Sequence, residues 1–493
     1  MTEGPSSTNR DMARGGAWMV AMRWAMKSVG LVSTLVLVRL LDPADFGVIA
    51  MAMIVVGFLE VLTMAGVDLA VIRHENPERA DYDAAWTLQV LLAAGIGALL
   101  LVCAPYAAAM FDEPKLVAVL RALALRAVIG GFQNIGVAQF RRDLAFSKDF
   151  QFNVYKTLLT SGATLVAALI LRNYWALVLG LIVSQVFMVA LSYAMHPYRP
   201  RLTLSNWGQY WSFSVWLIVH HLARFLSRRL DQFIVGTVAG TQFMGRYSVA
   251  FDIATLPSNE LVVPMNRGFF PVYARLQGDP ADLATSFVNA LSTIALLCFA
   301  LGFGLFAVAE PAVLVLLGPR WADVVPLVEA LSVFGVFLAL ATSAEALLTS
   351  VGRTRLLALV GIGNGVLLAA ALLITVRSVD VDAVAWARCL AALVALPLVY
   401  GAIRLVAPVS ARAVAGALWP RAVAAAIMVG AVRGIAWPAF PPVALLALQV
   451  TAGGVVYTLA TWGLWRLRGA PDSVEKSIRD RVAGRLVRFR AAG

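Results

Sequence analysis

The sequence predicts an all-α, polytopic membrane protein with about 14 transmembrane helices. Of its 493 residues, 60% are hydrophobic and only 14% are charged, whereas soluble globular chains carry about 25% charged residues. The apolar residues also form continuous blocks, long enough to cross a hydrocarbon core of ~30 Å as helices. Because every backbone polar group in lipid needs an internal partner, helices are the expected spanning elements.

Short polar connections divide the apolar blocks into consecutive spans. The first span follows the polar segment 1–15 and lacks the small-residue site of a cleavable signal peptide, so we expect it to be retained. The expected spans are 16–40, 46–72, 84–104, 116–139, 153–171, 174–195, 211–238, 244–270, 283–308, 325–349, 355–376, 382–404, 418–436 and 440–465.

Positive charge in the connections predicts the orientation of the spans. Cytoplasmic connections are rich in Lys and Arg, and here the even-numbered connections hold most of these residues, whereas the odd-numbered ones hold about one each. The even-numbered set is Arg73 and Arg79; Arg141, Arg142 and Lys148; Arg199 and Arg201; Arg275; Arg353 and Arg355; Arg404 and Arg412. This asymmetry predicts an even number of spans with both termini in the cytoplasm.

A short internal repeat indicates that the spans form two lobes. The stretch from Leu41 to Gly47 and the stretch from Ala239 to Gly245 both lie between an odd and an even span, six spans apart. Repeated halves are common in transporters, with the substrate path between them. We therefore expect a cytoplasmic N-terminal segment, an N-lobe of spans 1–6, a cytoplasmic linker, a C-lobe of spans 7–12, spans 13–14 and a basic cytoplasmic tail, at 1–15, 16–195, 196–210, 211–404, 405–465 and 466–493.

The tail combines basic residues with apolar residues at helical spacing, such as Val474, Ile478 and Val482. This pattern fits an amphipathic helix on the anionic inner leaflet, and it fits equally well a solvated tail that follows the positive-inside rule. We expect the bilayer, and no nucleic acid, as the partner of this charge, because no folded soluble domain accompanies it.

Several expected spans carry charged residues, which are costly in a bilayer and therefore usually face a wet cavity or a partner. They concentrate in spans 1, 2, 7 and 8. Guanidinium and ammonium groups suit an anionic substrate, and guanidinium matches phosphate oxygens with paired hydrogen bonds. We predict a cationic substrate cavity lined by Arg23, Lys27, Arg224, Arg228 and Arg267. The acidic residues that we assign to ion coupling or to structural polar contacts are Glu60, Asp68, Asp231, Asp252 and Glu260.

Each of these positions has a structural interpretation as well. Arg23 and Lys27 fit side chains that snorkel from the cytoplasmic end of span 1. Arg228 or Arg229 fits an ion pair with Asp231, and Glu60 and Asp252 fit hydrogen bonds between helices. The histidines of span 7 fit packing positions better than a proton relay.

The chain has no sequence motif of an enzyme. It contains no Walker A sequence, no nucleophile elbow and no zinc-protease motif. Cys103, Cys298 and Cys389 lie apart in apolar blocks, as expected of small buried hydrophobes and not of disulfides or metal ligands. We expect a transporter that is not an enzyme and needs no cofactor or metal, driven by a gradient or by the downhill flow of its substrate.

Several segments resemble one family of transporters. They are Leu40–Gly47, Gly66–Arg73, Arg141–Phe146, Tyr174–Gly180, Leu230–Gly236 and Gly245–Ala250. In this order and spacing, over roughly residues 10–405, the chain resembles the polysaccharide transport (Wzx-like oligosaccharide flippase) family of the multidrug/oligosaccharidyl-lipid/polysaccharide exporter superfamily. The last two spans and the tail match that family only in being hydrophobic and basic.

The resemblance implies two six-helix lobes around a V-shaped central cavity, with two further C-terminal helices. It also implies a flippase in the bacterial inner membrane that moves an undecaprenyl-diphosphate-linked oligosaccharide repeat unit for exopolysaccharide, capsule or O-antigen synthesis by alternating access. A polysaccharide polymerase and chain-length or export machinery are the implied protein partners.

Three alternatives stay open at the level of sequence. A cation-coupled multidrug exporter of the same fold would need an acidic and aromatic cavity, which the basic residues of spans 1 and 7 disfavour. A peptidoglycan-precursor lipid flippase is closely related. A membrane polysaccharide polymerase or polyprenyl-linked glycosyltransferase needs a large catalytic loop, which the short connections do not provide.

Overall fold

A computed structural model describes residue 26 and residues 28–62, 79–142, 146–203, 214–375, 381–438 and 440–469. These residues form helices, turns and irregular connections, and no β-strand occurs among them. Ten helices in the described part are long and apolar enough to cross a membrane. The prediction of an all-α, multi-pass membrane protein is therefore confirmed.

The chain divides into two compact units, which are described separately. Unit 1 comprises Met1–Phe225 and Ala239–Gly245, and unit 2 comprises Leu226–Val238 and Arg246–Gly493. The helix α10 (Ser214–Pro257) contributes to both, and its backbone leaves the helical conformation at Gly240, where φ is 74° and ψ is 179°. Glycine tolerates a positive φ without the steric cost of a Cβ.

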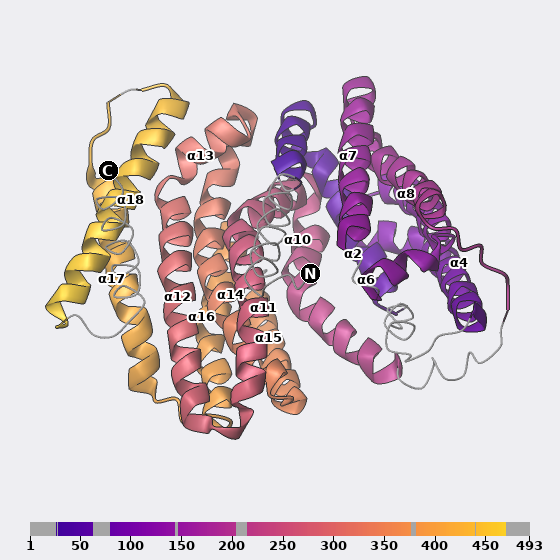
Figure 1. Ribbon diagram of the computed structural model, residues 1–493. Helices are drawn as coiled ribbons and strands as arrows, with labels where there is room; N and C mark the ends of the chain where they lie inside the picture. The colour runs from indigo at the N-terminus through magenta and orange to yellow at the C-terminus, as the bar shows by residue number, and fades with distance from the viewer. Residues whose placement is uncertain are drawn as a thin grey trace, which may run out of the picture. The chain divides into compact units, whose positions relative to one another are not determined.

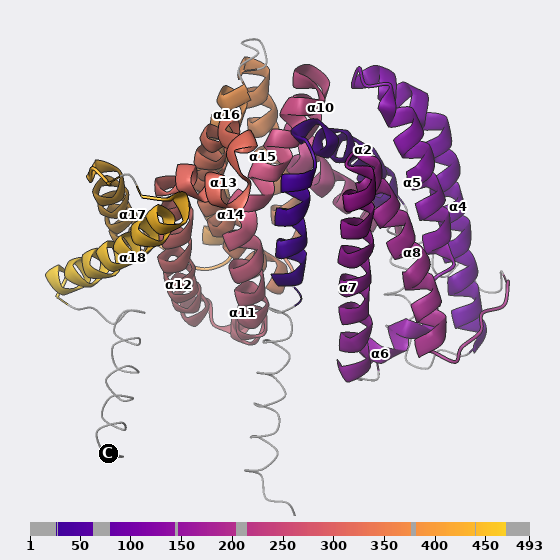
Figure 2. The ribbon, with the colours of Figure 1, turned by 90° about the horizontal axis from the view of Figure 1, so that it is seen from above.

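Unit 1 contains an apolar helix, Ser28–Leu40, followed by α2, α4, α5, α7 and α8. Their bounds are Pro43–Leu62, Arg79–Met110, Lys115–Gly131, Phe146–Leu171 and Trp175–Met195, and the short α6 (Gln139–Arg142) precedes α7. The helices α4, α5, α8 and α7 pack in that order, as Figure 2 shows from above. The expected break between spans 5 and 6 is confirmed, because α7 ends at Leu171 and α8 begins at Trp175.

Unit 2 has α14 as its most enclosed helix. The bounds of α11 to α18 are Val263–Arg275, Pro280–Ala307, Ala309–Leu316, Val325–Ser350, Thr354–Thr375, Val381–Arg404, Ala411–Gly434 and Pro442–Leu467. α14 packs against α11, α12 and α16, and α17 and α18 form an outer pair beside α12 (Figure 1). The hydroxyl of Tyr457 on α18 donates to the carbonyl oxygen of Leu296 on α12 at 2.9 Å, which fastens this pair to the unit.

A π-helical turn, Ser258–Val262, joins α10 to α11. The sequence pattern predicts one continuous span here, and the structure keeps it helical throughout but widens one turn, with Pro257 before the turn and Pro264 after it. Proline lacks the N–H that a continuous α-helix needs. The Ser258 hydroxyl donates to the carbonyl oxygen of Gly335 on α14 at 2.6 Å, so the turn is anchored in the unit.

Contacts between connections follow the expected alternation of spans. In unit 1 the N–H of Tyr174, the first residue of expected span 6, donates to Asp45 of connection 1. In unit 2 Arg246, near the start of expected span 8, pairs with Asp323 of connection 9 at 2.8 Å. Both contacts join residues in or next to odd-numbered connections, as expected of consecutive helices that cross a layer in alternate directions.

Candidate functional site

The first segment of the internal repeat, residues 41–47, contains the start of α2 and the residues that cap it. Pro43 takes the first position of α2, where its missing N–H costs nothing. The N–H of Asp42 donates to Asp45 Oδ2 at 3.1 Å, and the other oxygen, Oδ1, accepts from the N–H of Tyr174 at 2.9 Å. One carboxylate therefore caps α2 and ties it to the turn between α7 and α8.

The two halves of the repeat touch each other within unit 1, through their glycines. A Cβ added to Gly47 would lie 1.7 Å from the carbonyl oxygen of Thr241, and a Cβ added to Gly245 would lie 1.7 Å from that of Pro43. Pro43 and Thr241 hold the same position in the two segments, as do Gly47 and Gly245. The contact is therefore reciprocal, like that between two copies related by a two-fold axis. We call it the glycine crossing; only a residue without a side chain fits at Gly47 and Gly245.

Unit 2 holds a buried ion pair between α10 and α16. The Asp231 side chain is fully buried, with 0% of its surface exposed, and 6% of that of Arg388 is exposed. Nη1 of Arg388 contacts Asp231 Oδ1, and the hydroxyl of Tyr247 donates to Asp231 Oδ2 at 2.6 Å. The carboxylate thus has a positive partner and a hydrogen-bond donor inside the unit, which a buried charge requires.

Two aromatic rings complete the surroundings of Arg388. Its guanidinium carbon lies 4.5 Å from the ring centroid of Phe334 and 5.2 Å from that of Phe251, distances at which a cation is attracted to a ring face. Its Nη2 donates to the carbonyl oxygen of Arg228 at 3.4 Å. These contacts join α10, α14 and α16. Arg388 and Tyr247, which bind the Asp231 carboxylate, both belong to unit 2. Arg228 or Arg229 was the partner expected from the sequence, and the structure shows Arg388 on Asp231.

Two basic residues that precede Asp231 on α10 have exposed side chains. They are Arg228 and Arg229, and Nη1 of Arg229 donates to Oε1 of Gln232, one turn along the helix. Further along the chain, Asp252 and Arg267 are exposed and Glu260 is half-buried. The part of span 7 within unit 2 therefore has a buried acidic side and an exposed basic side.

In unit 1 the predicted residue Glu60 pairs with Arg126. Glu60 Oε1 on α2 lies 3.3 Å from Arg126 Nη1 on α5, and 40% and 22% of the two side chains are exposed. The predicted residues Arg23, Lys27 and Asp68 lie outside the described residues, as does the tail from 470 onward. Arg224 lies on α10, in a stretch where the side chain is not described.

The segment after α8 is fastened to the start of α4 in unit 1. The hydroxyl of Tyr198 donates to Asp83 Oδ1, which also accepts from the N–H of Arg201 at 2.9 Å. The amide of Asn134 donates to the carbonyl oxygen of Tyr198 at 2.8 Å. Burial, and then the bond to the Asp83 carboxylate, raise the pKa of Tyr198 well above its usual value. The first part of the expected linker 196–210 is thus held on unit 1.

Arg126 and Arg388 are not among the site residues predicted from the sequence. Arg388 is a lone arginine inside its apolar span, and Arg126 shares its span with Arg121. A charged residue inside a span usually needs a partner. The partner could not be identified, because Asp231 and Glu60 are far from them along the chain. Among the described residues, no group of three or more His, Cys, Asp or Glu could hold a metal ion.

Residues 36–326 match the family described as "Polysaccharide biosynthesis protein". The chain belongs to this family. The lipopolysaccharide biosynthesis protein WzxC of Escherichia coli K12 is 22% identical over 347 residues, which are 69% of this chain and 70% of WzxC. The succinoglycan biosynthesis transport protein ExoT of Rhizobium meliloti 1021 is 24% identical over 330 residues, 66% of this chain and 67% of ExoT.

Solved transporter structures share the fold. The lipid II flippase MurJ in an inward closed conformation superposes with a TM-score of 0.76 at 10% identity, covering 91% of this chain and 99% of MurJ. An inward-facing multidrug resistance transporter of the MATE family, in the MOP superfamily, gives a TM-score of 0.60 at 15% identity, covering 77% of this chain and 95% of that chain. The predicted family is confirmed by the match over residues 36–326, and the fold is that of solved transporter structures.

Proposed function

We propose that this protein flips an undecaprenyl-diphosphate-linked oligosaccharide repeat unit from the inner to the outer leaflet of the bacterial inner membrane, for exopolysaccharide, capsule or O-antigen synthesis. The family match over residues 36–326 carries the proposal. The relatives named for lipopolysaccharide biosynthesis and for succinoglycan transport support it, and so does a fold shared with a lipid flippase.

The exposed basic residues are the proposed binding groups for the diphosphate. Arg228 and Arg267 are exposed in unit 2, and Arg224, Arg23 and Lys27 extend this set along spans 7 and 1. A diphosphate offers several anionic oxygens, which guanidinium groups bind with charge-assisted hydrogen bonds. The polyprenyl chain stays in the lipid, so only the polar head needs a wet path.

Of the acidic residues, Asp231 takes a structural role in this proposal, because Arg388 and Tyr247 already occupy its carboxylate. Glu60, Asp252 and Glu260 are at least partly exposed, and with Asp68 they are the candidates for coupling to a cation gradient. Translocation breaks no covalent bond and uses no cofactor.

The glycine crossing supports alternating access. It brings backbone against backbone with no side chain between, so its two helix ends can separate without extracting a buried side chain. Both segments belong to odd-numbered connections, which the distribution of Lys and Arg assigns to the outer side. We propose that the crossing closes the substrate path toward the outside and opens when the path faces outward.

The same distribution of charge underlies the remaining features of the proposal. In the proposed orientation both termini lie in the cytoplasm. A polymerase and chain-length or export machinery take the repeat unit on the outer side.

The proposal is tested in a strain that lacks the gene. Repeat units are expected to accumulate on the inner leaflet, with loss of surface polymer and normal peptidoglycan precursors. The double variant Arg224→Ala/Arg228→Ala, at normal membrane levels, is expected to restore less than about a tenth of the polymer. The control Arg275→Ala/Arg412→Ala removes the same charge from two exposed positions and is expected to restore it fully.

Three outcomes would overturn the proposal or its site. Normal sidedness of the repeat units in the deletion strain would reject the flippase function. Accumulation of peptidoglycan precursors would identify the other lipid flippase reaction. Equal polymer from the two double variants would remove Arg224 and Arg228 from the binding site.

A further inference from the structure

A hollow opens at one end of unit 2, between the α14–α15 turn and the end of α16. It has a volume of about 570 Å³ and is lined by Gly352, Arg353, Arg355, Leu356 and Leu405. This volume lies in the range of small-molecule sites, about 300–1,000 Å³. We call it the rim pocket. It is separate from the predicted cavity residues, because none of them lines it.

The sequence builds the turn that exposes the two arginines. α14 ends in a Schellman motif, in which the N–H of Gly352 donates to the carbonyl oxygen of Thr349 at 3.1 Å and the N–H of Arg353 to that of Leu348 at 3.0 Å. Gly352 has a φ of 73°, which favours glycine. The chain then reverses into α15, so Arg353 and Arg355 flank the start of that helix.

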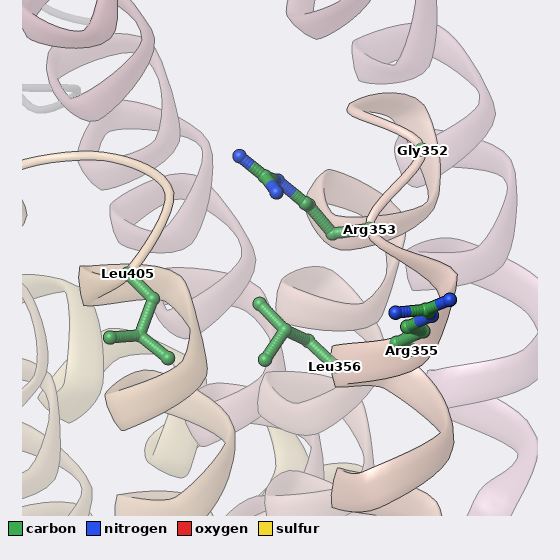
Figure 3. A pocket seen from close by; sticks show the side chains of 5 residues that line it. All are labelled: Gly352, Arg353, Arg355, Leu356 and Leu405. Atoms are coloured by element: carbon green, nitrogen blue, oxygen red, sulfur yellow. The ribbon is translucent and has the colours of Figure 1, made fainter.

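Neither arginine of the rim pocket has an ion-pair partner within the part of the chain that the structure describes. Other arginines of unit 2 do: Arg246 lies 2.8 Å from Asp323, and Arg433 lies 2.6 Å from Glu329. The side chains of Arg353 and Arg355 are exposed, and Arg353 reaches out over the hollow in Figure 3. Two unneutralised charges and the N-terminus of α15, a helix of 22 residues, favour an anion here.

The rim pocket also has two apolar side chains, one on each side. Leu356 on α15 and Leu405 beyond α16 extend toward each other (Figure 3). Leu405, the residue after the end of α16, is 72% exposed. A small inorganic anion would leave these leucines in contact with water. A ligand with a phosphate beside an alkyl chain would satisfy both the arginines and the leucines.

The position of the α14–α15 turn in the chain indicates where such a ligand would come from. The turn is the tenth connection, which the distribution of Lys and Arg assigns to the cytoplasmic side, and that leaflet contains anionic lipids. Basic pockets between helices on this side are typical sites for lipid head groups. We propose that the rim pocket binds the phosphate of an anionic glycerophospholipid of the inner leaflet, with Arg353 and Arg355 on the head group and Leu356 and Leu405 on the acyl chain. This inference does not depend on the transported substrate.

The test uses the purified, delipidated full-length protein in a neutral detergent. Short-chain phosphatidylglycerol is added, and binding is followed by native mass spectrometry and by the shift of the melting temperature. The wild type is expected to bind phosphatidylglycerol in preference to phosphatidylcholine. Arg353→Ala/Arg355→Ala is expected to weaken that binding about 30-fold, the effect of two basic groups beside an anionic lipid.

The matched control is Arg275→Ala/Arg412→Ala, which removes the same charge from exposed positions of two even-numbered connections outside the pocket. It is expected to keep the wild-type affinity. A second variant, Leu405→Asp, is expected to weaken the lipid binding and leave the fold intact, because the side chain is exposed. Equal losses in the two double variants would overturn the site. An equal stabilisation by sodium phosphate, or by phosphatidylcholine, would overturn the assignment to an anionic lipid.

Discussion

The glycine crossing of unit 1 and the buried ion pair of unit 2 hold helices together by different means. At the crossing, Gly47 and Gly245 bring two helix ends so close that no Cβ fits, and the contact is made by backbone. In the ion pair, Asp231 and Arg388 meet through side chains that are almost completely buried. One contact relies on shape alone, and the other relies on charge.

This difference indicates which contact can open during a transport cycle. Separating the ion pair inside the unit would leave a buried charge without a partner, which typically costs about 3–5 kcal/mol. Separating two glycine surfaces loses only packing contacts, and the energy of each such contact is small. We therefore expect α10, α14 and α16 to move as one body, and we expect the glycine crossing to open and close.

Breaking the ion pair is expected to have the largest effect. Arg388→Leu leaves the Asp231 carboxylate fully buried without its positive partner, so we expect a loss of about 3–5 kcal/mol in stability. Thermal unfolding of the purified protein in detergent measures this loss. Arg404→Leu, at an exposed position on the same helix, is the control and is expected to change stability by less than about 0.5 kcal/mol.

The double variant Asp231→Asn/Arg388→Leu separates charge from packing. The asparagine side chain would still accept a hydrogen bond from Tyr247, and the uncompensated charge would be gone. We expect the double variant to recover at least half of the stability that Arg388→Leu loses. If it unfolds at the same temperature as Arg388→Leu, the ion pair is not what holds these helices together.

Filling the glycine crossing is expected to have the second largest effect. Gly47→Ala places a methyl group where the structure leaves 1.7 Å to the carbonyl oxygen of Thr241. Overpacking of this kind costs about 1–3 kcal/mol, which is roughly a 5- to 150-fold shift away from the closed crossing. We expect surface polymer to fall strongly, and Gly245→Ala to behave in the same way.

Gly162→Ala is the control for this substitution. No atom lies within 4 Å of a Cβ added to Gly162 on α7, and alanine is the better helix former. This variant is expected to give normal polymer and equal or higher stability. Normal transport and stability in both Gly47→Ala and Gly245→Ala would show that the crossing does not close the path.

Much of the fold could be predicted from sequence, because the bilayer imposes a simple rule on span length. Apolar blocks of the right length became helices, and local signals set their ends, such as the Asp42–Asp45 cap of α2 and Gly352 after α14. The π-helical turn that begins at Ser258 could not be predicted from the nearby prolines and serine. The π-helical turn there depends on an anchor in α14, which no local pattern reveals.

The candidate site was predictable only in part, because its pairing is long-range. Charge inside a span indicates that a partner exists, and it does not say which residue that partner is. Asp231 has two arginines nearby on its own helix, yet the helix directs them to its exposed side and α16 supplies Arg388. The glycine contact is a different case, since the two segments of the short repeat are brought together within unit 1.

The smallest expected effect is at Glu60, the ion pair of unit 1. Glu60 and Arg126 lie 3.3 Å apart with 40% and 22% of their side chains exposed, so water weakens the pair and its loss is expected to cost less than about 1 kcal/mol. Glu60→Gln and Arg126→Gln should therefore unfold close to the wild-type temperature. If the carboxylate takes part in coupling, Glu60→Gln alone reduces surface polymer, and this is the result that we expect. Equal polymer loss in the two variants would make the pair structural, a weaker counterpart of Asp231 and Arg388.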